Sequence, residues 1–268
     1  MQRTFAVVFI LLTTLMYYRA GAQNLDWKRS SGLDGGTVLS LLHLSNGDVL
    51  AGTEVGLFLS RSPGDAWELH GIRAANINAL ARRGDTLFAG IGYSSEDGSG
   101  GVFRSTDGGS TWSKNLTTEY VWCVAASDMV LAVGTDGNGV FTSATGAEWK
   151  NGLAGMSVYA ITIRGNTLYA GTESNGVFAS TDAGTTWTNI GLTNRGSIYG
   201  LCSSASRIVA CGDFGVAVSL NGTTWTPGGL QGQTVWCVAL QGDTLYAGTD
   251  TTGVEVRIGT TPWRGSDL

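Results

Sequence analysis

The chain of 268 residues is poor in the residues from which common functional sites are built. Histidine occurs twice, proline three times and cysteine four times, and charged residues make up only 14% of the sequence. The lysines and arginines form no cluster, which argues against nucleic acid or an acidic membrane surface as a partner. The sequence also lacks a GxSxG motif that would present a nucleophilic serine. We therefore expect no cofactor and no nucleic-acid partner.

Only one apolar run is long, and it lies at the N-terminus. Residues 5–15 are mostly apolar, Arg3 precedes them, and a small-x-small cleavage site ends at Ala22. These features are typical of a signal peptide, because the run is shorter than the ~20 residues that span a bilayer. We expect residues 1–22 to be removed and residues 23–268 to form one domain without a transmembrane segment. Such a protein would be secreted, periplasmic or on the cell surface.

The four cysteines match no zinc-binding spacing, because none forms a CxxC pair and the two histidines lie elsewhere. We expect no metal site. Cys123 and Cys237 lie in matching VWC triplets and are predicted to be core residues. Cys202 and Cys211 flank an expected hairpin turn, where a disulfide and two free thiols both stay open.

Glycine and tryptophan, by contrast, are abundant and periodic. The chain has 41 glycines, and successive intervals between seven of its tryptophans are 40, 45, 37, 38, 38 and 38 residues. These tryptophans are Trp27, Trp67, Trp112, Trp149, Trp187, Trp225 and Trp263. Four short sequence segments, which we call phrases, recur between these tryptophans. They are an apolar phrase such as YVWCVA, a second such as TLYAGT, a third such as GVFAS, and the tryptophan segment itself.

Each phrase is short and rich in β-branched and aromatic residues, which is typical of a strand. Six complete sets of four phrases predict an all-β fold, a six-bladed β-propeller of four-stranded antiparallel blades. The second phrase ends near a glycine that we expect at matching positions: Gly52, Gly90, Gly134, Gly171, Gly212 and Gly248.

Seven tryptophan segments compete for six fourth-strand positions. LDWKRSSGL at 25–33 and TTPWRGSDL at 260–268 both resemble a fourth strand, and only one of them fits the last blade. We prefer the N-terminal segment, because it would tie the two ends together and cover an exposed strand edge. The C-terminal segment is the alternative, and competition between the two stays open.

The turns before two tryptophans match the pattern S-x-D-x-G-x-x-W completely. The matching residues are Ser105, Asp107, Gly109 and Trp112 in one turn, and Ser180, Asp182, Gly184 and Trp187 in the other. Three further turns, SRSPGDAW, SATGAEW and SLNGTTW, keep part of the pattern. The chain thus resembles Asp-box (BNR-repeat) β-propellers, and in particular secreted bacterial proteins likened to the photosystem II stability/assembly factor. The resemblance covers essentially the whole expected mature chain.

The Asp box indicates a fold rather than a reaction. Its aspartate can accept backbone N–H bonds inside its own turn, its glycine adopts a left-handed conformation, and its tryptophan fills a gap between strands. We therefore expect a structural role for the box. A ligand or ion site at the box is the weaker alternative.

Sialidases and xyloglucanases also carry this box, so a glycoside hydrolase is the alternative function. Resemblance to sialidases would imply an Arg-Ile-Pro segment and an arginine triad, but the chain has no such segment and its arginines fall at unlike repeat positions. A xyloglucanase needs two carboxylates across a cleft, and the xyloglucanases are longer, with two propellers. We predict no catalytic residues and a non-catalytic binding or assembly scaffold.

The best candidates for ligand binding are aromatic. Four of them hold equivalent positions in the first phrase of successive units: Trp122, Tyr159, Tyr199 and Trp236. Glu96 and Asp97 lie in IGYSSEDGSG, the longest loop of its class. Aromatic rings beside carboxylates can bind sugars or peptides near a channel mouth, which makes these residues candidates for binding a protein or glycan ligand. The interpretation that we favour, however, is that the rings only pack between blades.

Overall fold

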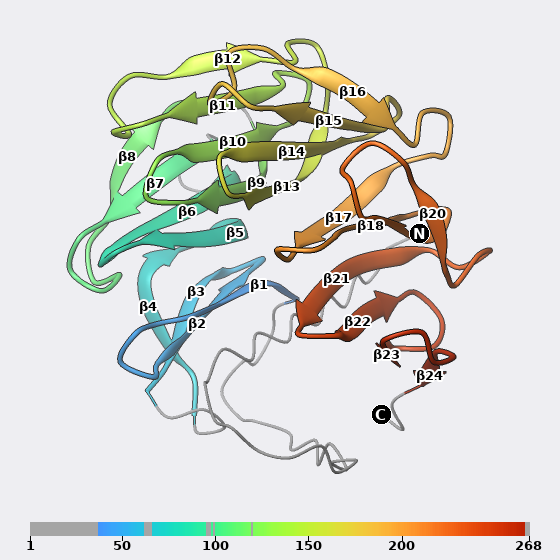
Figure 1. Cartoon of the computed structure of the whole chain (residues 1–268). Coiled ribbons are helices and arrows are strands. Elements are labelled where there is room, and N and C mark those ends of the chain that lie inside the picture. Colours follow the sequence, from blue (N-terminus) through green and yellow to red (C-terminus); the bar gives the residue numbers. More distant parts are fainter. Residues whose placement is uncertain (1–36, 62–65, 95–97, 99, 119, 266–268) are drawn as a thin grey trace.

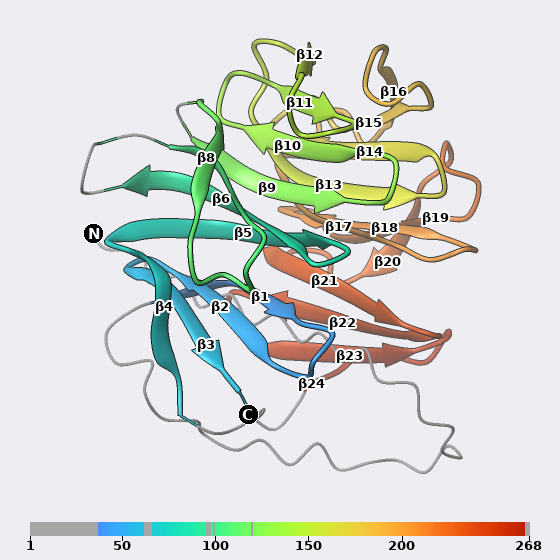
Figure 2. The same ribbon diagram turned by 90° about the vertical axis from the view of Figure 1, so that its left-hand side faces the viewer.

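The computed structural model describes residues 37–61, 66–94, 98, 100–118 and 120–265. Within these ranges the regular elements are all strands, arranged as six sheets of four antiparallel strands each. Figures 1 and 2 show the sheets following one another around a common axis, with the first (blue) beside the sixth (red). The chain is a six-bladed β-propeller, so the prediction from the repeat is confirmed. The described residues contain no helix that is long and apolar enough to cross a membrane.

Each blade uses its strands in chain order from the inside to the outside. The first, innermost strands are β1 (Val38–His43), β5 (Ala75–Arg83), β9 (Val121–Ala126), β13 (Val158–Arg164), β17 (Ile198–Ser203) and β21 (Val235–Gln241). The second strands are β2 (Val49–Thr53), β6 (Thr86–Ser94), β10 (Leu131–Thr135), β14 (Thr167–Thr172), β18 (Ile208–Gly212) and β22 (Thr244–Thr249). The second strand of blade 3, β10, is buried along its whole length, because neighbouring blades cover both of its faces.

The outer half of each blade is more exposed. The third strands are β3 (Gly56–Ser60), β7 (Gly101–Ser105), β11 (Val140–Ser143), β15 (Val177–Ser180), β19 (Gly215–Ser219) and β23 (Val254–Ile258). The fourth strands are β4 (Glu68–Arg73), β8 (Ser113–Leu116), β12 (Lys150–Gly152), β16 (Thr188–Gly191), β20 (Thr226–Gly229) and β24 (Arg264–Gly265). The turn between the second and third strands therefore lies at the same end of each blade as the start of the first strand.

The repeated glycine of the second strand lets neighbouring blades approach closely. A Cβ atom at Gly52 would lie 2.6 Å from the carbonyl oxygen of Ile77 in the next blade, and one at Gly134 would lie 2.6 Å from that of Val158. A side chain at either position would push two blades apart, because protein interiors are packed without spare volume.

Blade 5 departs from the predicted glycine position. The register pairs Gly200 with Cys211, whereas blade 3 pairs Cys123 with Gly134. Gly212, which we expected at this position, pairs with Ile198 instead. In blade 5 the cysteine thus lies on the second strand and the glycine on the first, the reverse of blade 3. A Cβ atom at Gly200 would lie 2.7 Å from the Cys211 sulfur. The same space is filled from the opposite side.

Four of the turns between second and third strands share a hydrogen bond, buried in the first three of them, that was not predicted from the sequence. A threonine hydroxyl at the end of the second strand donates to the carbonyl oxygen of the glycine that begins or precedes the third strand. The pairs are Thr53–Gly56, Thr135–Gly139 and Thr172–Gly176 at 2.8 Å, and Thr249–Gly253 at 3.0 Å. This bond satisfies a hydroxyl that would otherwise be costly to bury.

Buried hydrophobic clusters join the blades in chain order. One cluster contains Phe88 and Val102 of blade 2 with Val121 and Leu131 of blade 3, and others join blades 1 and 2, 3 and 4, 4 and 5, and 5 and 6. Within the described ranges, no such cluster combines residues of blades 6 and 1. The junction of the sixth and first blades is therefore the most weakly packed one in the described part of the ring.

The C-terminal segment holds the fourth-strand position of the last blade. β24 pairs with β23 through two residue pairs, Glu255 with Gly265 and Val256 with Arg264. This is the alternative of the two predicted arrangements. The N-terminal segment that we preferred, residues 25–33, lies outside the described residues, as does the expected signal peptide.

Candidate functional site

The four aromatic residues predicted to bind ligand lie in one continuous row. Each is the second residue of its inner strand and follows a fully buried valine or isoleucine. Tyr120, just before β9, extends the row, and we call all five residues the aromatic belt: Tyr120, Trp122, Tyr159, Tyr199 and Trp236. Successive ring centroids along the belt are 4.5, 5.1, 6.0 and 4.5 Å apart.

The rings of the belt pack between blades and remain partly exposed. Its rings touch across blade boundaries, and Tyr159 and Tyr199 stack with an interplanar angle of 14°. Each ring is also only half-buried, so part of its surface faces solvent. Contacts of this kind favour packing by about 0.5–1.5 kcal/mol for each pair. The belt therefore both connects blades 3 to 6 and presents an apolar surface.

The belt does not continue into blades 1 and 2. The equivalent positions there are Leu39 in β1 and Asn78 in β5, as their place in the strand register shows. The side-chain amide of Asn78 donates to the carbonyl oxygen of Val121 at 2.7 Å. One side of the inner ring is thus aromatic, and the other side is aliphatic or polar.

Two carboxylates lie beside the belt in turns that follow second strands. Burial, together with the Glu173 carboxylate that is hydrogen-bonded to its hydroxyl, raises the pKa of Tyr159 above its usual range. The Asp136 carboxylate acts in the same direction and accepts a hydrogen bond of 2.7 Å from the Ser157 hydroxyl. Tyr159 therefore remains a neutral hydrogen-bonding phenol at physiological pH.

Trp122 contributes an unused donor to the belt. Its indole Nε1 is buried and has no hydrogen-bond partner among the described residues. A buried N–H group without a partner costs about 1–3 kcal/mol.

The other two candidate ligand residues, Glu96 and Asp97, lie outside the described residues. They belong to the connection between β6 and β7, which joins a second strand to a third strand. By topology this connection starts and ends at the belt's end of blade 2. Their participation in binding stays a prediction.

The two complete Asp-box turns lie between third and fourth strands, at the opposite end of each blade from the start of the inner strand. In blade 2, the Asp107 carboxylate accepts from the Ser105 hydroxyl at 2.8 Å, the Thr111 backbone N–H at 2.9 Å and the Thr111 hydroxyl at 2.6 Å. The Gly109 N–H donates to the Ser105 hydroxyl at 2.9 Å. These bonds lie within one turn, and the threonine bonds lead in lowering the pKa of Asp107 to about 2.

Blade 4 repeats this geometry. Asp182 accepts from Ser180 at 2.8 Å and from the Thr186 backbone and hydroxyl at 2.9 and 2.6 Å, and its pKa is likewise lowered to about 2. The Gly184 N–H donates to the Ser180 hydroxyl at 2.9 Å. The carboxylate oxygens are engaged inside the turn, which gives the box a structural role here.

Some of the repeated tryptophans bond within their own turns, and several contact the preceding blade. Trp112 and Trp187 donate through Nε1 to the carbonyl oxygens of Gly109 and Gly184, at 2.8 and 3.1 Å. Trp263 reaches farther and donates to Gly228 of the preceding blade at 2.9 Å. The indole of Trp187 also lies against Gly152 of the preceding blade, where a Cβ atom would come within 2.4 Å of Nε1.

The cysteines provide neither a disulfide nor an activated nucleophile. None of the four cysteines forms a disulfide, and Cys202 pairs across the hairpin with Val209 rather than with Cys211. Burial raises the pKa of Cys123 and Cys202 to about 12 and that of Cys237 to about 11. Since the thiolate is the reactive form, a raised pKa lowers the fraction of each thiol that can react at neutral pH. No group of metal-binding side chains occurs in the part of the chain that the structure describes.

Comparison with known proteins identifies the fold and not the activity. No family model matches the chain, and no curated protein matches its sequence. Among solved structures, YCF48 bound to a D1 peptide has a TM-score of 0.69 and 15% identity, with 91% of this chain and 86% of that chain covered. YCF48 from Cyanidioschyzon merolae has a TM-score of 0.68 and 17% identity, with coverage of 90% and 88%.

A second group of similar structures consists of enzymes. The GH74 xyloglucanase from Xanthomonas campestris has a TM-score of 0.67 and 19% identity, and the match covers 90% of this chain. The chain spans 46% of the length of that enzyme. At these identities the likeness concerns the propeller fold, which hosts binding proteins and enzymes alike.

Proposed function

We propose that this chain is a secreted, non-catalytic β-propeller that binds a protein or peptide at the aromatic belt. The observation that carries the proposal is the row of half-buried rings on the inner strands of blades 3 to 6. A similar propeller structure is that of YCF48 bound to a D1 peptide, which supports a peptide as the class of ligand.

The chemistry of the belt suits a peptide that offers both apolar and polar groups. The rings provide a large rigid contact surface, and the entropic cost of ordering them is low because they already pack together. Asp136 offers a carboxylate acceptor beside the rings. A glycan could use the same rings by stacking, so it is the competing ligand.

The second candidate function is glycoside hydrolysis, which the fold similarity to a GH74 xyloglucanase favours. A panel of fluorogenic glycosides and xyloglucan fragments tests it directly. If the chain hydrolyses a glycoside, and a single carboxylate-to-amide substitution near the belt abolishes this activity, then the chain is an enzyme and not a binding scaffold. We expect no turnover with any member of the panel.

Substitution of the belt tests the binding role. We expect Trp122→Ala and Trp236→Ala each to weaken binding of peptides selected from a displayed library by about tenfold or more, as loss of a buried aromatic anchor does. Leu39→Ala is the matched control, because Leu39 holds the equivalent strand position in blade 1. Isothermal titration and thermal melting are measured on the same preparations. If both tryptophan variants lose cooperative melting while the control does not, the rings are core residues and the proposal fails.

A further inference from the structure

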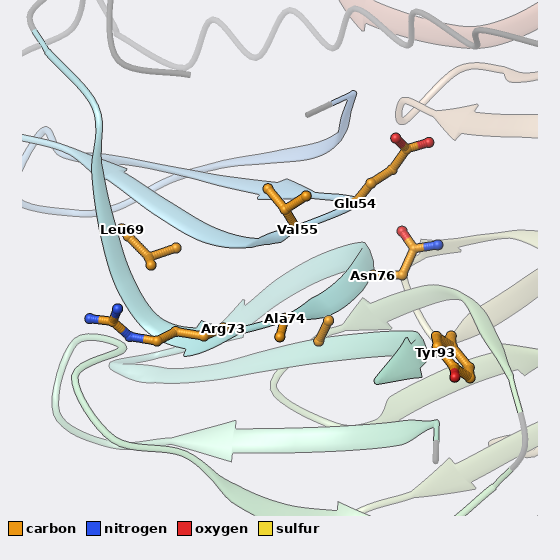
Figure 3. Close-up of a pocket in the computed structure, with 8 residues that line it drawn as sticks. Glu54, Val55, Leu69, Arg73, Ala74, Asn76 and Tyr93 are labelled. Atoms are coloured by element: carbon orange, nitrogen blue, oxygen red, sulfur yellow. The ribbon is translucent and has the colours of Figure 1, made fainter. Parts of the chain in front are cut away.

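A pocket of about 650 Å³ lies between blades 1 and 2, where the belt is interrupted. Its walls come from the β2–β3 turn, the end of β4, the start of β5 and the end of β6, and Figure 3 shows the side chains that line it. Backbone bonds hold the rim in place, since Ala74 N–H donates to the Val55 carbonyl oxygen at 3.1 Å. The pocket is therefore part of the fold rather than a gap between loose segments.

The pocket lies at one end of the aromatic belt. Asn76, on its wall, directly precedes Ile77, just as Tyr120 directly precedes Val121 in the next blade. Gly92, next to Tyr93 of the pocket, lies against Tyr120, because a Cβ atom on Gly92 would be 2.5 Å from the tyrosine ring. One ligand could therefore contact both features.

One end of the pocket is rich in hydrogen-bond acceptors. The side-chain Oδ1 of Asn76 is buried and has no partner among the described residues. Figure 3 shows the Glu54 carboxylate and the Tyr93 ring on the same side of the pocket as Asn76. Tyr93 is 54% exposed although it is aromatic. A buried acceptor beside a carboxylate favours a ligand group with several N–H donors, as in an ammonium or guanidinium group.

The middle and the opposite end have different chemistry. Val55 lies in the middle beside the small side chain of Ala74, and Leu69 lies toward the opposite end in Figure 3. Val55 and Leu69 are 42% and 36% exposed. Arg73 stands at the far end in Figure 3, pointing away from Glu54. A guanidinium group recognises a carboxylate well because its N–H groups match the carboxylate oxygens. The pocket is thus acceptor-rich, then aliphatic, then cationic.

We propose that this pocket binds an extended peptide segment with a cationic side chain, an apolar side chain and a carboxylate in succession. The cation contacts Glu54 and the orphan oxygen of Asn76, the apolar side chain covers Val55 and Leu69, and the carboxylate contacts Arg73. The aliphatic middle favours a peptide over a glycan, because sugars stack on flat aromatic faces. The inference rests on the proposed binding role, but it names a site apart from the belt.

The probe is a fluorescent peptide library in which one Lys and one Glu flank a central Leu, in both orders and with alanine spacers of varied length. We expect at least one spacing to bind, and replacement of its Lys or its Glu by Gln to weaken binding about tenfold, as loss of one charge-assisted hydrogen bond does. Glu54→Gln should remove the advantage of Lys over Gln, and Arg73→Gln should remove the advantage of Glu over Gln.

Matched controls lie at equivalent turns of other blades. Asp250→Asn and Arg195→Gln make the same changes of charge at exposed positions, after β22 and between β16 and β17. Both should leave peptide affinity unchanged. Glu54 and Arg73 are exposed as well, so their variants should melt like the wild type.

The outcomes separate this inference from the proposed function. If selectivity for Lys and Glu is unchanged in Glu54→Gln and Arg73→Gln but is lost in Trp122→Ala, the proposed pocket is wrong. The proposed binding role of the belt then stands. If peptide binding depends on Glu54 and Arg73 but is unchanged in Trp122→Ala, the proposed pocket is supported and the proposed binding role of the belt is wrong. Binding of xyloglucan fragments instead of any peptide overturns the inference, and so does an absence of binding by the whole library.

Discussion

Asp107 and Asp182 show how a single residue type stabilises a turn. Each carboxylate gathers two hydroxyl donors and at least one backbone N–H through both of its oxygens. Blade 5 solves the same problem with Asn221, whose one carbonyl oxygen accepts the N–H groups of Thr223 and Thr224 at 2.9 and 2.8 Å. The amide cannot accept on its second side, because that atom is a donor.

This difference predicts the acid sensitivity of the propeller. The pKa of both aspartates is lowered from 3.8 to about 2 in the folded chain. Their stabilising contribution is therefore present above pH 3.8 and is lost as pH falls through about 2. We expect the double variant Asp107→Asn, Asp182→Asn to be slightly less stable at pH 7 and to lose less stability on acidification.

Thermal melting as a function of pH, compared with the wild type, measures this difference. Asn221→Asp offers the reverse change in blade 5 and should add acid sensitivity. If the double variant and the wild type lose stability in parallel between pH 5 and pH 2, other carboxylates dominate acid unfolding.

In blades 1, 3, 4 and 5, a glycine of the fourth strand lies against the tryptophan of the next blade. In blade 5 this strand, β20, ends at Gly229, where a Cβ atom would lie 2.3 Å from Nε1 of Trp263. The backbone there has a φ of +109°, a conformation that residues with a side chain rarely adopt. Two features therefore require glycine at position 229: the positive φ of its backbone and the close approach of the Trp263 indole.

Substitution of this glycine tests the contact between blades. Gly229→Ala should destabilise the chain by about 2–6 kcal/mol, since strain at a positive φ and overpacking each cost about 1–3 kcal/mol. Gly232 separates the two terms, because its φ is +83° but no atom lies within 4 Å of a Cβ there. Gly232→Ala should cost only the backbone term. Equal losses in urea unfolding would show that the indole accommodates a methyl group.

The whole ring is held together by contacts between successive blades, and these contacts are uneven. Buried clusters connect the first blade through to the sixth, but none in the described ranges connects the sixth to the first. The last blade also ends in β24, the shortest of the fourth strands, with two residues. The ring should therefore open first at this junction.

Hydrogen exchange measures this directly, because local opening exposes amides in proportion to its free energy. We expect amides of β1, β2, β21 and β22 to exchange faster than those of β10 and β14, and removal of residues 260–268 to widen the difference. Uniform protection around the ring would instead mean that the sixth and first blades are joined as firmly as the others.

Much of the architecture could be predicted because the information is local. The phrase YVWCVA at 120–125 became β9, and SIYGLC at 197–202 became β17, each displaced by one residue. The number of blades followed from the tryptophan spacing. Cys211 was harder, because the adjacent Gly212 was taken as the repeated glycine, whereas the strand register places Cys211 at that position, opposite Gly200.

The sequence by itself determined the six blades, their strands and their turns, since each blade repeats the same short-range pattern of apolar phrases, glycines and tryptophans. Only the tertiary structure decided which rings touch, which carboxylate faces Tyr159, and that Asn76, Glu54 and Arg73 line one pocket. These features depend on how one blade meets the next. Contacts between residues far apart in the chain depend on that spatial arrangement, which the repeat pattern of a single blade does not contain.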